Sequence, residues 1–155
     1  MSERDNAATV RTLYQAFNDK DLERLASLAE ADAQMEDVPF DTTAGWRDSW
    51  EGWATAFPDG TFEVKNLVAS GDTVVAEIHA RGTHTGPLQG SDGTLHPTQR
   101  KLDVRLCEVF ELKNGKIVRG RSYFDWAGMQ EQMGLQPGAS IAPPQSLPAA
   151  GEARH

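Results

Sequence analysis

Apolar residues occupy every second position over long stretches of the second half of the chain, as in strands with one buried face. In the segment 102–112, LDVRLCEVFEL, the apolar even positions are Leu102, Val104, Leu106, Phe110 and Leu112. Side chains alternate between the two faces of a strand. The remaining even position is Glu108, so a carboxylic acid should point the same way as the leucines.

The order of the elements predicts the fold class. Segments 61–69 and 73–82 are strand-like and joined by SGD, and two long strands flank KNGK, so both pairs should be hairpins. Before them, apolar residues at helical spacing predict three helices, with a short strand at 33–37 before the third. A last helix follows Asp125. This order predicts an α+β fold, a strongly curved antiparallel sheet wrapped around the helices as a cone with an internal pocket.

Length and charge limit the domain count and the partners. A chain of 155 residues suits one domain, expected over 1–135, followed by a Pro/Ala-rich tail at 136–155 that should be disordered or lie on a partner. A net charge of -8 argues against nucleic-acid or anionic-membrane partners. No long apolar segment and no signal-like stretch is present, and Cys107 is the single cysteine, so a cytoplasmic location is expected.

Two carboxylates are candidates for acid–base chemistry. Glu108 on an apolar face should have a raised pKa, unless it sits at the mouth of the cone or pairs with an arginine. Asp37 ends the segment AQMED and shares its parity with Ala33 and Met35, so it should also face inward. The alternative for Asp37 is a solvent-facing carboxylate at the end of a strand.

Two further polar positions have competing interpretations. His84, in RGTHTG, shares the parity of Ile78 and Ala80 and so should point inward, where it either orients a substrate or stabilises the loop by hydrogen bonding. The loop 83–98 is rich in Gly and Pro and long enough to bind a ligand. Asp125 is best interpreted as the N-cap of the last helix.

Aromatic residues at inward positions could line the cone. An aromatic lining suits flat polycyclic ligands, although core packing alone also explains most such stripes. These residues are Tyr14, Phe17, Trp46, Trp50, Trp53, Phe110 and Phe124. No cluster has metal-ligand spacing, and no phosphate or dinucleotide motif is present, so neither a metal nor a cofactor is expected.

Several segments resemble the SnoaL-like polyketide cyclase group of the nuclear-transport-factor-2-like superfamily. The resemblance covers roughly residues 7–135 and rests on LYQAFNDKDLERLASL, FPDGTFEVKNLVASGDTVV, ARGTHTG, VFELKNGKIV and YFDWAGMQEQMGL. The superfamily includes cyclases, steroid isomerases, epoxide hydrolases, dehydratases and non-catalytic binding modules. The fold therefore does not define one reaction.

The resemblance implies roles for individual residues. Glu108 matches an Asp that donates a hydrogen bond to the oxyanion in ketosteroid isomerases, whereas similar cyclases have His there. Asp37 lies in a context like that of the isomerase base. Ser122 stands where cyclases and limonene-type epoxide hydrolases have a catalytic Asp. The isomerase oxyanion Tyr matches Leu13, and Tyr14 is one residue away, about 100° around the helix, which argues against steroid isomerase activity.

The expected function is a cofactor-free enzyme that binds a hydrophobic, carbonyl-bearing, polyketide- or steroid-like molecule. Asp37 would be the base, Glu108 the acid or oxyanion donor, and His84 and Ser122 orienting groups for cyclisation, isomerisation or dehydration. A non-catalytic binding module and a protein that uses only its outer sheet face are alternatives. Epoxide hydrolysis or epoxide-opening cyclisation is a further one, disfavoured because VVAEIHARG lacks the required Arg–Asp pair. The resemblance also implies a homodimer.

Overall fold

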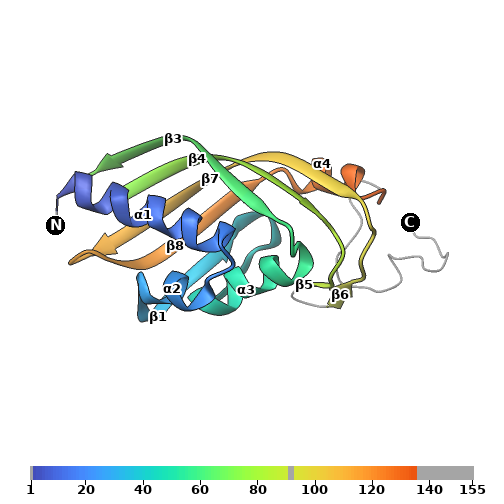
Figure 1. Ribbon diagram of the computed structural model, residues 1–155, viewed down its shortest axis with the longest axis horizontal. Coiled ribbons are helices and arrows are strands. Elements are labelled where there is room, and N and C mark those ends of the chain that lie inside the picture. The colour runs from blue at the N-terminus through green and yellow to red at the C-terminus, as the bar shows by residue number, and fades with distance from the viewer. Residues whose placement is uncertain (1, 91–92, 136–155) are drawn as a thin grey trace.

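The computed structural model describes residues 2–90 and 93–135, so the predicted tail at 136–155 lies outside the described residues. Figure 1 shows a curved sheet with a long helix lying across one of its faces. The helices are α1 (Glu3–Asn18), α2 (Leu22–Ser27), α3 (Trp46–Ala56) and α4 (Trp126–Gln132), as expected in number and order. Within the described residues, none of the helices has the length and apolar character needed to cross a membrane.

Four long strands form the body of the sheet and follow one another along the chain as antiparallel neighbours. The strands are β3 (Thr61–Ser70), β4 (Thr73–Thr83), β7 (Lys101–Lys113) and β8 (Lys116–Phe124). Asn114 and Gly115 both have positive φ in the turn between β7 and β8, as the Asn-Gly pair predicts. The α+β fold with hairpin-connected strands is therefore confirmed.

The sheet differs from the prediction in two details, both at the edge beside β8. Strand β1 spans Ala29–Asp37, which is longer than the predicted 33–37, and it runs parallel to β8, so the sheet is mixed rather than wholly antiparallel. A short 3-10 helix, η1 (Val38–Phe40), then leads into β2 (Thr42–Gly45), which pairs with β1. The positive φ of Asp41 makes this tight return possible. The strand order is β2-β1-β8-β7-β4-β3.

Two apolar clusters fill the concave side. The larger lies between α1, α2, α3 and the inner sheet face, and it includes Leu13, Phe17, Trp50 and Phe110. The smaller closes the other end of the cone. It contains Leu88 and Leu95 from the short strands β5 (Leu88–Gly90) and β6 (Gly93–Leu95), which sequence analysis did not predict. Each contributes one buried leucine, so neither shows an alternating pattern.

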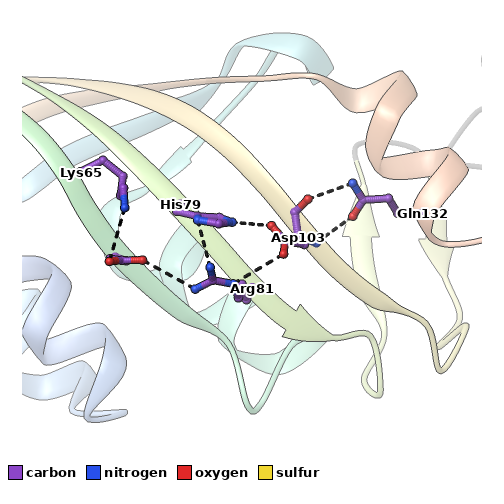
Figure 2. A network of polar contacts seen from close by, with 6 residues as sticks. Lys65, His79, Arg81, Asp103 and Gln132 are labelled. Atoms are coloured by element: carbon purple, nitrogen blue, oxygen red, sulfur yellow. Dashed lines mark hydrogen bonds and ion pairs between the residues drawn. The ribbon is translucent and has the colours of Figure 1, made fainter.

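The outer face of the sheet carries many charged side chains, beside the exposed Val68 and Tyr123. Figure 2 shows a network of charged side chains that runs across β3, β4 and β7. Arg81 is paired with Glu63 and Asp103, and Asp103 also contacts His79. Gln132 of α4 accepts a hydrogen bond from the backbone N–H of Asp103 and donates one to its carbonyl oxygen. This face is solvated, so the apolar cavity lies on the opposite side.

Candidate active site

Three polar residues form one row across adjacent strands on the inner face. Glu108 of β7 lies opposite Ser122 of β8, and Ser122 lies opposite Asp37 of β1. All three line the same cavity. The register of three strands therefore brings together residues that are far apart in the sequence, and we call this set the carboxyl row.

The cavity above the carboxyl row is mainly apolar. The hollow and its open mouth together enclose about 640 Å³ of space not occupied by atoms. Its walls include Phe17, Met35, Trp50, Trp53, Phe57, Phe62, Leu102, Val104, Leu106, Phe124 and Met129. Such a lining favours a hydrophobic ligand with few polar groups.

Glu108 is buried at the base of the cavity. The residue is only 4% exposed. Its Oε1 accepts a hydrogen bond of 2.7 Å from the hydroxyl of Tyr14. Burial raises the pKa of Glu108 to about 7, and the charge of Asp37 adds to this, while hydrogen bonds from Tyr14 and Ser122 oppose it. Burial also raises the pKa of Tyr14, so its hydroxyl remains a donor.

Asp37 lies at the end of β1, where the chain turns into η1. Burial raises its pKa to about 6, and the hydrogen bond from the indole of Trp53 partly offsets this rise. The donor is the Trp53 Nε1, 3.4 Å from Oδ2. The lower pKa makes Asp37 the carboxyl group of the pair that ionises more readily.

Tyr14 contacts Glu108 from behind the cavity. Leu13 and Tyr14 are both fully buried, because α1 packs deeply against the inner sheet face and the rings of Trp50, Phe62 and Phe110 surround Tyr14. The Tyr14 ring itself does not line the cavity, and only its hydroxyl touches the back of Glu108. Sequence analysis placed Tyr14 in the lining of the cone, whereas in the structure it lies in the core behind the cavity and contacts Glu108 through its hydroxyl.

His84 points inward as predicted but lies outside the cavity lining. Its Nδ1 accepts a hydrogen bond from the backbone N–H of Thr98 at 3.2 Å and lies 3.1 Å from the Thr98 hydroxyl. Its ring packs against Phe57, with centroids 5.3 Å apart, and burial lowers its pKa. The geometry is that of a residue that holds the loop, one of the two interpretations open from the sequence.

The predicted aromatic lining is divided between the cavity and the core. Four of the residues line the cavity: Phe17, Trp50, Trp53 and Phe124. Tyr14, Trp46 and Phe110 lie behind it in the core, and Trp46 donates to the carbonyl of Leu25 at 3.2 Å. The parity of Leu102, Val104 and Leu106 could have identified them as lining, whereas Met129 and Phe57 carried no such signal.

A further expectation concerns the start of α4. Asp125 caps α4, since its side chain accepts a hydrogen bond of 3.0 Å from the backbone N–H of Gly128. Within residues 2–90 and 93–135, no group of three His, Cys, Asp or Glu side chains is placed to hold a metal ion.

The curved sheet with helices on its inner face is the fold of solved SnoaL-like and nuclear-transport-factor-2-like structures. The chain belongs to the SnoaL-like polyketide cyclase family, which it matches over residues 7–133. No curated protein matches the chain in sequence.

Solved structures share this fold. AclR from Streptomyces galilaeus, with a suggested hydroxylase activity, is 25% identical with a TM-score of 0.71, over 86% of this chain and 98% of AclR. IdmH from Streptomyces antibioticus, with a suggested polyketide cyclase activity, is 29% identical with a TM-score of 0.68, over 84% of this chain and 99% of IdmH. A SnoaL-like protein from Jannaschia shares the fold at 18% identity and a TM-score of 0.71, over 84% of this chain and 92% of that one.

Proposed function

We propose that the protein is an acid–base enzyme that moves a proton at the carbon next to a carbonyl group of a hydrophobic, polyketide- or steroid-like substrate. The observation that carries the proposal is the carboxyl row, in which an ionisable Asp37 and a protonatable Glu108 face one apolar cavity. The suggested cyclase activity of IdmH supports the substrate class.

The two carboxyl groups have complementary roles in this proposal. The Asp37 carboxylate removes the proton alpha to the carbonyl, and neutral Glu108 donates a hydrogen bond to the oxygen as negative charge develops there. In cyclisation, the enolate carbon attacks a second carbonyl, and the resulting alkoxide takes the proton from Asp37. In isomerisation, Asp37 returns the proton to another carbon. In dehydration, the enolate expels a hydroxyl group, which takes the proton from Asp37 and leaves as water.

Two other residues position these groups. The Tyr14 hydroxyl fixes one oxygen of Glu108, which itself lines the cavity. Ser122 stands between the two carboxyl residues on β8, where its hydroxyl can bind Glu108 or a substrate oxygen. Sequence analysis gave His84 an orienting role as well, but its place outside the cavity lining does not support that role.

The proposal is tested without knowledge of the natural substrate. Proton NMR in deuterated water follows exchange of the alpha protons of 2-tetralone, a small bicyclic ketone. Wild-type protein should accelerate exchange over buffer, and Asp37→Asn should lose the acceleration. Asp103→Asn, a carboxylate change on the outer face, is the matched control. Binding of 2-tetralone without any accelerated exchange would instead favour a non-catalytic binding module.

A homodimer and a cytoplasmic location stay predictions. Sedimentation at micromolar concentration tests the first, and a monomer at that concentration would contradict it.

A further inference from the structure

A second hollow adjoins the cavity and differs from it in chemistry. We call it the groove; η1, β2, α3 and β5 contribute its walls. It is lined by Asp37, Phe40, Thr42, Thr43, Ala44, Asp48, Ser49, Gly52, Trp53, Leu88 and Gln89. Three of these residues, Asp37, Ser49 and Trp53, also line the cavity.

The side chain of Trp53 separates the groove from the cavity. Phe40, which lines only the groove, lies nearly parallel to the Trp53 ring at 6.2 Å, and Phe57, which lines only the cavity, does so at 6.1 Å. The indole N–H of Trp53 donates a hydrogen bond of 3.4 Å to Asp37. A ligand seated beside Asp37 in the cavity is therefore one side chain away from the groove.

The groove offers hydrogen-bonding groups that the protein does not use. The side chains of Thr42, Thr43, Asp48 and Ser49 form no hydrogen bond with another described residue. Among the described residues that line the groove there is no Lys, Arg or His, whereas Asp37 and Asp48 can both carry negative charge. An anionic group would be repelled there, and a hydroxyl or amino group would find acceptors.

We propose that the groove is the subsite for a polar arm of the substrate, neutral or cationic and bearing hydroxyl or amino groups, while the apolar rings of the same molecule occupy the cavity. The arm passes Trp53 and binds the threonine, serine and Asp48 side chains. This inference deepens the proposed function and rests on it for the identity of the ring system. The substrate class becomes an amphipathic molecule, a carbonyl-bearing ring system with a hydroxyl- or amine-containing substituent.

Gly52 allows a clean test. It lies in α3 and lines the groove, and a Cβ built on it would have no atom within 4 Å. A phenylalanine at this position would therefore project into free space and fill the groove. Glycine is also a poor helix former, so Gly52→Ala should not destabilise α3 and serves as the matched control.

The experiment compares two sets of 2-tetralones by isothermal titration calorimetry. One set carries a 2-hydroxyethylamino arm at each aromatic ring carbon in turn, and the other carries an n-butyl arm at the same positions. Wild-type protein and Gly52→Ala should bind the best polar-arm compound at least tenfold more tightly than its butyl partner. Gly52→Phe should reduce that ratio to near one. Asp48→Asn should reduce the preference for the amine by a smaller factor.

Each other result overturns the proposal. A wild-type ratio near one, or no detectable binding of any polar-arm compound, would mean that the groove is not a polar subsite. A preference that survives in Gly52→Phe would place the arm elsewhere. Exchange of the alpha protons of unsubstituted 2-tetralone is measured in parallel. That readout does not involve the arm, so failure of the acid–base proposal and failure of the groove proposal are distinguishable.

Discussion

Strand β7 carries two carboxylates in opposite environments. The side chain of Asp103 is 63% exposed on the outer face, where it contacts His79 and Arg81 (Figure 2). Glu108, on the same strand, is buried on the inner face against Tyr14. The hydrogen bond with His79 lowers the pKa of Asp103, whereas burial raises the pKa of Glu108 to about 7. A carboxyl group on the outer face of this strand thus ionises more readily than usual, whereas one on the inner face holds its proton to higher pH.

The difference arises from strand parity and from what covers each face. Position 103 is odd and faces solvent beside His79 and Arg81, and position 108 is even and faces the helices. Inside, the nearest hydrogen-bond donors to Glu108 are the neutral hydroxyls of Tyr14 and Ser122. Neutral donors offset only part of the desolvation, so the raised pKa persists.

The largest expected effect is on catalysis. Glu108→Gln should lower the rate of alpha-proton exchange at least 100-fold, since a positioned acid typically contributes that much. Asp103→Asn should leave the rate within twofold. The comparison between the two faces would fail if both variants lost activity equally or if Glu108→Gln kept the wild-type rate.

The next effect is on stability and its dependence on pH. The folded state holds the Glu108 proton up to about pH 7, whereas the unfolded chain releases it near pH 4.5. The stability that this proton contributes is present below pH 4.5 and is lost as the pH rises to about 7. At pH 8, Glu108→Gln should therefore be more stable than wild type, by on the order of 3 kcal/mol.

Denaturant unfolding at pH 4 and pH 8 measures this effect, and the advantage of Glu108→Gln should vanish at pH 4. Asp103→Asn should behave in the opposite sense, because the pKa of Asp103 is lowered. The Asn variant should be less stable than wild type at neutral pH, and the difference should shrink on acidification. A stability gain for Asp103→Asn that grows with pH would contradict the account.

The pH profile of exchange should be bell-shaped. Activity needs Asp37 ionised and Glu108 protonated, so kcat/KM should rise through pH 6 and fall above pH 7, about tenfold per pH unit beyond each limb. Glu108→Gln should remove the alkaline limb from whatever activity remains. A wild-type profile that is flat from pH 5 to pH 9 would exclude this pair of roles.

A smaller effect is expected for Tyr14→Phe. Its hydroxyl opposes the pKa rise of Glu108, so its removal should raise that pKa further and move the alkaline limb to higher pH. We expect kcat/KM to fall about tenfold, because Glu108 is no longer held in place, and stability to fall by about 1 kcal/mol. A lower kcat/KM without a shift of the alkaline limb of the pH profile would mean that Tyr14 affects packing alone.

Much of the fold followed from the sequence because its signals are local. Alternation within β7 placed Glu108 on the apolar face, and the Asn114-Gly115 turn fixed the hairpin that brings Ser122 beside it. The parity of Asp37 with Met35 was likewise enough to turn it inward. These are properties of single strands and single turns.

What could not be predicted depends on distant contacts. The parallel pairing of β1 with β8, which completes the carboxyl row, joins segments with no local signal for one another. The rotation of α1 that brings Tyr14 to Glu108 is set by packing on the sheet. His84 was correctly expected to point inward. Only the folded structure shows that its ring accepts a hydrogen bond from Thr98 and does not line the cavity.

The most direct test of the central claim is a carbon-13 NMR titration of protein labelled at the glutamate side-chain carboxyl carbon, with Glu108→Gln used to assign the Glu108 resonance. The account predicts a midpoint near pH 7 for Glu108, well above the ordinary value of 4.5. A midpoint near 4.5 would mean a solvated or paired carboxylate, and the neutral acid at the base of the cavity would be contradicted.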